Sequence, residues 1–140
     1  MIAVDTNVVL RYVLQDHNDQ SRRANKLFSD KEAILISDVV LAEAVWVLTG
    51  AKYRVPRTEI IGLVHSLIEE PNVRFEDSQR VWQALSLFRR APRRKGKQAD
   101  FADVLILLSS RATVEAKGQM FEGWFTFDRG ARLLEGAMAP

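Results

Sequence analysis

Two aspartates stand three residues apart at the head of a very apolar helical segment, in the stretch KQADFADVLILLSSRA at 97–112. Aspartate is a good helix N-cap, and acidic side chains in a first turn complement the positive end of the helix dipole. Asp100 and Asp103 also offer the oxygen ligands that hard divalent cations prefer. Their spacing alone leaves both roles open.

Two further aspartates follow expected strands. Asp5 ends the apolar run IAVD at 2–5, and Asp128 ends WFTFD at 124–128. Taken singly, an aspartate after a strand is usually a turn former or a helix cap. Because ligands bind beyond the carboxyl ends of the strands in a parallel sheet, two aspartates at one sheet edge favour a functional role.

Glu43 is the only polar side chain in the segment VVLAEAVWVL at 39–48. Helical spacing gives it the neighbours three and four positions away, on a face that we expect to enter the core: Val39, Val40, Trp46 and Val47. An unpaired ionised carboxylate there would be costly, so it would be neutralised, paired or bound to a cation. The alternative is a glutamate at the rim of the core whose carboxylate reaches water or an arginine.

If these carboxylates meet, they form one strongly acidic site. Like charges at such a site raise one another's pKa and repel, and a divalent cation is the usual remedy. The chain has no cysteine, and its two histidines, His17 and His65, are isolated in the sequence. An all-oxygen site suits Mg²⁺ or Mn²⁺ rather than Zn²⁺, and a metal ion held by carboxylates can activate water against phosphodiesters.

A basic loop directly precedes Asp100. Pro92 and Gly96 interrupt the segment 89–97, in which six of nine residues are basic: Arg89, Arg90, Arg93, Arg94, Lys95 and Lys97. Such a loop could follow a phosphate backbone and hold the phosphates that flank a reacting one. The alternative is a solvated surface loop without a ligand.

The elements that must position these residues follow a regular order. Short, mostly apolar strands are expected at 2–5, 33–37, 73–75 and 124–128, and helices lie between them and after the basic loop. Asn7 and Ser37 are the expected N-caps of the first helix and of the helix that carries Glu43. Apolar strands that alternate with helices predict a parallel sheet covered on both faces, in a single α/β domain over 1–140.

The composition agrees with such a domain. The chain has 140 residues, of which 47% are hydrophobic, enough for a core of ordinary size. The absence of cysteine excludes a disulfide scaffold and suits a reducing compartment. No basic stretch precedes a sustained apolar run at the N-terminus, and no apolar run could span a bilayer. We therefore expect a soluble, cytoplasmic protein that does not associate with a membrane.

These motifs resemble those of PIN-domain proteins, and within that group the chain is similar to the VapC toxins of bacterial toxin–antitoxin pairs. The matching blocks are VDTNVVLRYVL, SDVVLAEAVWVL, ADFADVLI and TFDRG, which occur in family order over nearly the whole chain. The resemblance implies a three-layer α/β/α sandwich with a short, mainly parallel sheet. It also implies a Mg²⁺- or Mn²⁺-dependent ribonuclease.

The resemblance assigns roles to individual residues. Asp5 and Asp103 would be the principal metal ligands, Glu43 and Asp128 would complete the acidic site, and Asp100 would be a further ligand or would hydrogen-bond to one. Small polar side chains would hydrogen-bond around this cluster: Thr6, Asn7 and Thr126. The resemblance further implies a homodimer, an antitoxin partner that covers the active site, and structured RNA substrates such as tRNA or rRNA loops.

The predicted reaction is hydrolysis of RNA by metal-activated water, with Glu43 orienting or deprotonating that water and a 5′-phosphate as product. One alternative is a PIN-type nuclease of RNA maturation or decay outside toxin–antitoxin systems. A second is a phosphotransferase with Asp5 as nucleophile, although Asn7 stands where that scheme usually needs an acid. A third is a non-catalytic module that binds RNA or protein, although a pure RNA binder gains nothing from concentrated negative charge beside phosphates.

Overall fold

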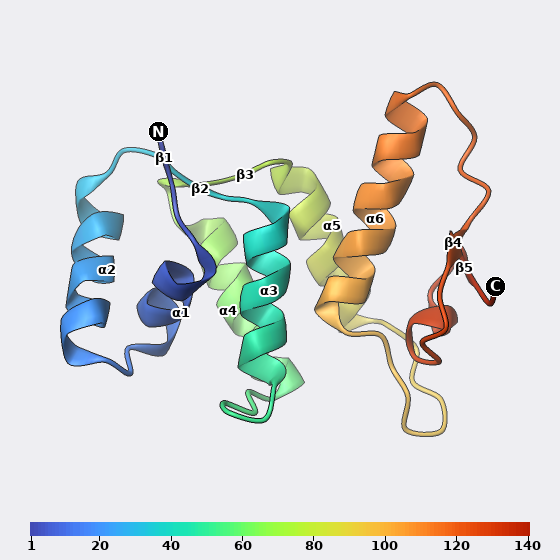
Figure 1. Cartoon of the computed structure of the whole chain (residues 1–140), viewed down its shortest axis with the longest axis horizontal. Coiled ribbons are helices and arrows are strands. Elements are labelled where there is room, and N and C mark those ends of the chain that lie inside the picture. Colours follow the sequence, from blue (N-terminus) through green and yellow to red (C-terminus); the bar gives the residue numbers. More distant parts are fainter. The chain divides into compact units, whose positions relative to one another are not determined.

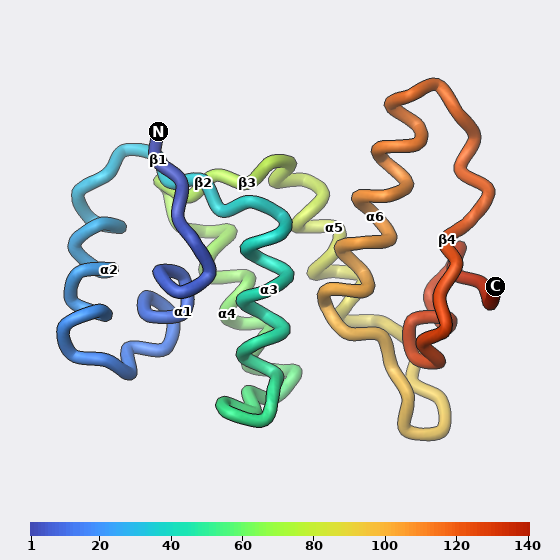
Figure 2. The backbone as a smooth tube through the Cα atoms, in the orientation of Figure 1, coloured from blue at the N-terminus to red at the C-terminus, as the bar shows by residue number.

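The computed structural model describes all 140 residues, and the chain forms two compact units, Met1–Ser78 and Gln79–Pro140. Figure 1 shows the helices and strands of each unit, and Figure 2 follows the backbone through them. Unit 1 is built on a parallel sheet with four helices, and unit 2 on two helices and a small second sheet. The single domain over 1–140 stays a prediction.

Unit 1 contains three of the four predicted strands. They are β1 (Ile2–Ala3), β2 (Ile34–Ile36) and β3 (Val73–Phe75), which run parallel in the order β1-β2-β3. Ile34 lies opposite Ile2 on one side and opposite Val73 on the other. Ile34 and Ile36 have no exposed surface, as expected of a central strand in a buried parallel sheet. The predicted parallel arrangement is confirmed for these strands.

Four helices accompany this sheet: α1 (Thr6–Leu14), α2 (Asn18–Asp30), α3 (Asp38–Thr49) and α4 (Arg57–Glu69). Helix α1 packs against α2 and α3, and α4 packs against α3 and β3. Tyr12 of α1 stacks on Phe28 of α2 with 3.8 Å between ring centroids, and its hydroxyl donates to Glu70 at 2.6 Å. Burial and this hydrogen bond raise the pKa of Tyr12 to about 12. One side chain thus ties α1 to α2 and to the end of α4.

The N-terminus of α1 differs from the sequence prediction. Asp5, not Asn7, is the N-cap, and its Oδ1 accepts the Val8 N–H at 2.9 Å. The backbone of Asp5 is still extended, with φ −90° and ψ 174°, whereas Asn7 already lies inside the helix. Its side chain therefore cannot take the cap position. The predicted cap of α3 is confirmed, since Ser37 accepts the Val40 N–H at 3.3 Å.

The face of α3 that carries Glu43 is exposed, so the prediction that it enters the core is wrong. Val39 and Trp46 on that face are 75% and 66% exposed, and Glu43 is exposed with them. The helix buries a different stripe, with the spacing i, i+3, i+4 and i+7: Leu41, Ala44, Val45 and Leu48. Because α3 is apolar on almost every face, the periodicity of its sequence does not indicate which face is buried.

Unit 2 contains α5 (Ser78–Arg89), which begins at the boundary between the units, and α6 (Phe101–Ala116). Phe88 of α5 meets Phe101 of α6 edge to face, with ring centroids 5.7 Å apart. Phe101 is completely buried in the first turn of α6. This packing fixes the start of α6, where Asp100 and Asp103 lie. No helix in the chain combines the length and apolar character that crossing a membrane requires.

The strand predicted at 124–128 is shorter than expected and does not join the three-stranded sheet. Strand β4 (Trp124–Phe125) pairs in parallel with β5 (Ala137–Met138), after a 3₁₀ turn η1 (Ala131–Leu133). The Trp124 N–H donates to Gly136 O at 2.8 Å. The expectation that Asp5 and Asp128 end strands of one sheet is therefore wrong, because the backbone of β4 finds its partner within unit 2.

Candidate active site

Two of the predicted acidic residues lie in unit 1, on α1 and α3. Asp5 begins α1 directly after β1, because the chain turns there from strand to helix. Thr6, only 9% exposed, donates from Oγ1 to Glu43 Oε2 at 2.6 Å. This hydrogen bond joins the first turn of α1 to the middle of α3. It gives the exposed Glu43 carboxylate a fixed position in unit 1.

The other three acidic residues lie in unit 2. Asp100 and Asp103 form a reciprocal capping box on α6. The Asp103 N–H donates to Asp100 Oδ1 at 2.7 Å, and the Asp100 N–H donates to Asp103 Oδ2 at 2.9 Å. Asp128 accepts the Ala131 N–H at 2.7 Å, and its own N–H donates to Thr126 Oγ1 at 3.1 Å. Asp100 is therefore the cap of α6, Asp103 completes its capping box, and Asp128 stabilises the turn that precedes η1.

All five carboxylates share one arrangement. One oxygen of each accepts a hydrogen bond within the chain, and the other oxygen accepts none: Asp5, Glu43, Asp100, Asp103 and Asp128. A carboxylate has lone pairs on both oxygens, so a helix cap does not prevent it from binding a cation as well. Capping and metal binding are thus compatible at these positions.

Asp103 shows the strongest electrostatic effect in the site. Burial and the negative charges of Asp100 and Asp128 together raise its pKa to about 6, against the opposing hydrogen bond from the Asp100 backbone. The pKa shift reflects burial first and the repulsion between neighbouring carboxylates second. The donors are all oxygens, which fits Mg²⁺ or Mn²⁺. Within each unit taken alone, no group of three or more His, Cys, Asp or Glu residues could hold a metal ion.

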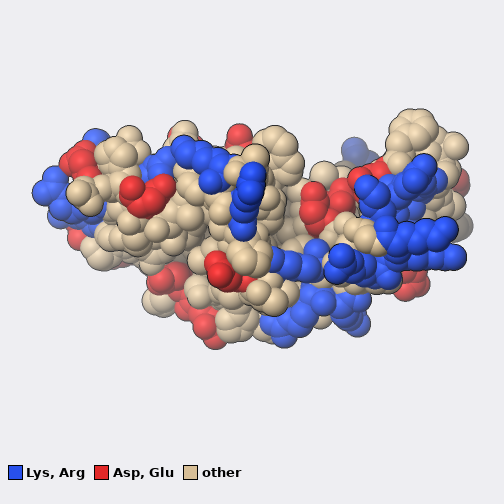
Figure 3. Space-filling view, turned by 90° about the horizontal axis from the view of Figure 1, so that it is seen from below, with Lys and Arg blue, Asp and Glu red and all other residues tan.

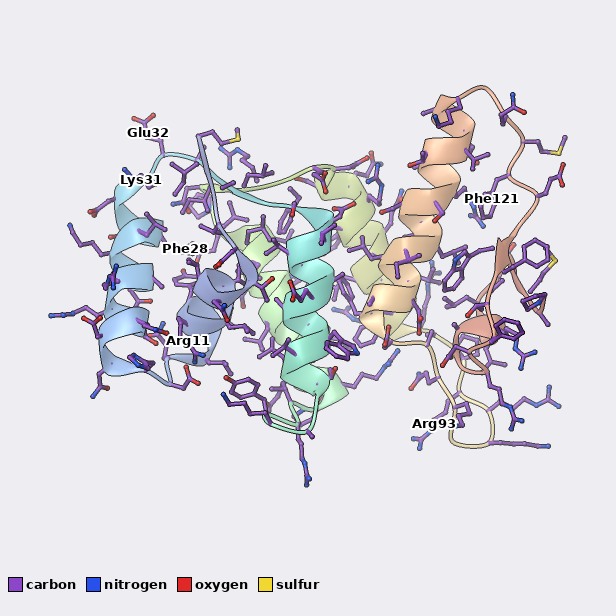
Figure 4. All side chains as sticks on the ribbon, viewed as in Figure 1. Arg11, Phe28, Lys31, Glu32, Arg93 and Phe121 are labelled. Atoms are coloured by element: carbon purple, nitrogen blue, oxygen red, sulfur yellow. The ribbon has the colours of Figure 1, made fainter.

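The basic loop is an ordered hairpin. Arg94 and Lys97 exchange two backbone hydrogen bonds of 2.9 Å, and the two residues between them, Lys95 and Gly96, have φ of 49° and 75°. Positive φ at both central positions is the signature of a tight type I′ turn. All six basic residues of this basic hairpin (89–97) are exposed, and Arg93 projects outward from it (Figure 4). Lys and Arg side chains gather over this part of unit 2 (Figure 3).

The base of the basic hairpin is held against the turn that follows Asp128. Gln98 donates from Nε2 to Ala91 O at 2.7 Å, which closes the base. Gly130 lies so close to it that a Cβ at this position would come within 2.5 Å of Gln98 O. Only glycine fits such an approach. The exposed cations and the Asp128 turn are therefore held in a fixed relation within unit 2.

A pocket of about 430 Å³ lies between α1 and α2 in unit 1. One wall comes from the start of α1 and the other from one face of α2: Asp5, Asn7, Val8, Arg11, Gln20, Arg23, Ala24 and Leu27. We call it the α1/α2 pocket. Sequence reasoning found only Asp5 and Asn7 among these residues. The i, i+3, i+4, i+7 spacing of the α2 residues was the one signal that pointed to a shared face.

Parallel strands, capped helices and carboxylates at the starts of two helices define an α/β protein with several acidic side chains of unassigned role. The family model of the PIN domain matches residues 2–134, and the chain therefore belongs to the PIN-domain family. PIN domains have a three-layer α/β/α fold and are generally nucleases, so the predicted family and fold class are confirmed. No curated protein and no solved structure matches the chain.

Proposed function

We propose that this protein is a Mg²⁺- or Mn²⁺-dependent ribonuclease that hydrolyses RNA phosphodiesters with metal-activated water. The observation that carries the proposal is the acidic start of α6 in a PIN-domain chain. There, burial and the negative charges of Asp100 and Asp128 together raise the pKa of Asp103 to about 6. A fold has no structural need for such repulsion, whereas a divalent cation relieves it.

The proposed ligands follow from the donor oxygens. Asp5 and Asp103 are the principal ligands, Glu43 and Asp128 complete the acidic set, and Asp100 contributes its second oxygen. When bound, the ion lowers the pKa of a water molecule and stabilises charge on the attacking and leaving oxygens. This requires no side-chain nucleophile.

Glu43 orients the attacking water or takes a proton from it at the carboxylate oxygen that Thr6 does not bind. The hydrogen bond from Thr6 limits rotation of the Glu43 side chain, so that its free oxygen keeps one direction. Thr126 supports Asp128 through the backbone N–H of that residue. Cleavage leaves a 5′-phosphate on the downstream fragment.

We further propose that the protein is the toxin of a toxin–antitoxin module. The order of the four sequence blocks supports this assignment. In this proposal the protein acts in the cytoplasm as a homodimer on structured RNA such as tRNA or rRNA, and a segment of the antitoxin covers the acidic residues. A PIN nuclease of RNA processing would share the chemistry but would not stop growth when produced without a partner.

The direct test is cleavage of a pool of structured RNAs by the purified protein, with Mn²⁺ or Mg²⁺ and with EDTA. We expect discrete cuts that require metal and leave 5′-phosphates. Cuts that persist in EDTA would contradict the metal-dependent mechanism, and no cutting by folded, metal-loaded protein would favour a binding module. Growth arrest on production of the chain alone would separate a toxin from a processing enzyme.

The basic hairpin provides a further prediction. Replacing Arg93, Arg94 and Lys95 with glutamine should weaken RNA binding and reduce its dependence on salt. Because the variant makes fewer phosphate contacts, fewer counterions are released when it binds RNA. We expect the slope of log K against log[salt] to fall by about 2 for three contacts on a single strand. Titrations at several salt concentrations measure the slope.

The control for the basic hairpin removes the same charge elsewhere. Arg22, Lys52 and Lys117 are exposed basic residues outside the hairpin, and a triple glutamine variant of these residues has the same net charge. We expect this control to change the salt slope by less than half as much. Equal slopes for the two triple variants would show that the hairpin is an ordinary solvated surface.

A further inference from the structure

The proposed reaction does not account for the α1/α2 pocket. Its volume of about 430 Å³ falls within the range of roughly 300–1,000 Å³ that is typical of small-molecule sites. Asp5, a proposed metal ligand, is one of its lining residues, so the pocket begins at the candidate active site. Whatever occupies it therefore lies beside Asp5.

Two guanidinium groups give the pocket positive charge. The Arg11 side chain is 18% exposed, and its Nη1 donates to Asp16 Oδ1 at 2.6 Å. Its Nε is buried and has no acceptor within the chain. Arg11 lines the pocket and adds positive charge to its wall, part of which the Asp16 carboxylate offsets. Figure 4 labels Arg11, which projects from α1 on the side of α2.

Arg23 on α2 supplies the second charge. Its closest carboxylate oxygen, on Asp19, lies 3.7 Å away, which is too long for a hydrogen bond. The Arg23 side chain is 76% exposed, so its guanidinium can turn toward a ligand without breaking a strong contact. Arginine binds phosphate oxygens through two N–H groups at once.

The remaining lining residues fit the rest of a nucleotide. Val8, Ala24 and Leu27 form an apolar wall against which a base can lie. Asn7 and Gln20 carry side-chain amides, which both donate to and accept from base edges. An apolar wall, amides and arginines in one small pocket match the surface that RNA-binding proteins offer to an unstacked base and its phosphate.

A second hollow extends the same surface along α2. It has a volume of about 260 Å³ and shares Arg23 and Leu27 with the α1/α2 pocket. Lys26 and Lys31 also line it, although Lys26 already binds Asp30 at 2.6 Å. Arg23 thus stands between a nucleotide-sized pocket and a cationic path suited to the next phosphates of a strand.

We propose that the α1/α2 pocket binds one unpaired nucleotide of the RNA substrate, next to the scissile phosphate, with its base on the apolar wall and its phosphate on Arg23 and Arg11. The inference rests on the proposed ribonuclease function and names a binding site for its substrate. A base within an A-form helix is stacked and paired and cannot enter such a pocket. The protein therefore selects cleavage positions with at least one unpaired nucleotide.

Two neighbouring arginines allow a matched test. Arg22 and Arg23 lie on the same helix, are 79% and 76% exposed, and share Asp19 as partner, but only Arg23 lines the pocket. We expect Arg23→Gln to weaken binding of a short single-stranded RNA about tenfold in EDTA, and to reduce the salt slope by about 1. Arg22→Gln should change the affinity by less than about twofold. Fluorescence anisotropy with a labelled oligonucleotide measures both.

Two results would overturn the pocket assignment. The first is an equal loss of affinity in Arg22→Gln and Arg23→Gln, which would reflect general charge, as expected if the pocket serves a protein segment instead. The second is an equal effect of Arg23→Gln on a blunt RNA duplex and on the single strand. Both substitutions are on an exposed face of α2, and circular dichroism of each variant confirms that it is folded.

The binding assay also separates this inference from the proposed function. It is carried out without metal, so it does not depend on cleavage. If the wild-type protein cleaves RNA but the two variants bind equally, only the pocket assignment fails. If the variants differ but no metal-dependent cleavage occurs, the pocket is a nucleotide site in a protein that is not a ribonuclease.

Discussion

Replacing Asp5 with asparagine is expected to lower metal-dependent RNA cleavage by more than about 100-fold while the protein remains folded. Asparagine retains the Oδ1 that accepts the Val8 N–H at 2.9 Å, and it is as good an N-cap as aspartate. The substitution removes the negative charge that the metal ion needs but leaves the start of α1 intact. This variant should therefore lose cleavage activity but keep its stability.

The measurement compares initial cleavage rates of wild type and Asp5→Asn over a range of Mn²⁺ concentrations. Thermal unfolding in EDTA establishes that the variant is folded. The control is Glu59→Gln, which removes one exposed charge from the first turn of α4 and should cleave at the wild-type rate. A rate for Asp5→Asn within a few-fold of wild type would exclude Asp5 as a principal ligand.

The Asp103→Asn substitution is expected to stop cleavage and, in the absence of metal, to stabilise the protein at neutral pH. The folded-state pKa of Asp103 is about 6, above the ordinary value of 3.8, so the folded protein holds this proton more tightly than the unfolded chain. The associated stability is present below about pH 4 and is lost as the pH rises to about 6. Because Asp103 is only half-buried, solvent screening limits the effect to about 1 kcal/mol, or a few degrees in Tm.

Thermal unfolding in EDTA at several pH values between 4 and 7.5 tests the sign. Wild type should lose stability relative to Asp103→Asn as the pH rises through this window. Asp19→Asn provides a contrast, because the hydrogen bond from Arg22 lowers the pKa of Asp19, so that this variant should lose a little stability at neutral pH. A wild type that gains stability relative to Asp103→Asn with rising pH would show that Asp103 is not repelled by its neighbours.

The sequence predicted the elements whose signal is local. Runs such as ILI and VRF are short and mostly apolar, and they form β2 and β3 as expected. Ser37 and Asp100 are the predicted caps because a cap depends only on the next few residues. The buried stripe of α3 was not predictable in this way. The helix has several stripes that are similarly apolar, and tertiary contacts determine which of them is buried.

The same distinction holds for the candidate site. The five acidic residues were found because aspartate and glutamate stand out in apolar surroundings, and the sequence order of their motifs is distinctive. Arg11 and Arg23 were missed, since an arginine on an amphipathic helix ordinarily faces water. Their role depends on how α1 packs against α2, which no short stretch of sequence specifies. The partner of β4 was missed because AM at 137–138 has no strand pattern.

The capping box of α6 has a consequence for how tightly a ligand can be held. Because the backbone N–H groups of Asp100 and Asp103 already restrict both side chains, little rotamer entropy remains to be lost on binding. The same hydrogen bonds make affinity depend on the integrity of a single helical turn. When the first turn of α6 frays, both carboxylates lose their orientation together, so the lifetime of the proposed metal complex would follow local unfolding of this turn.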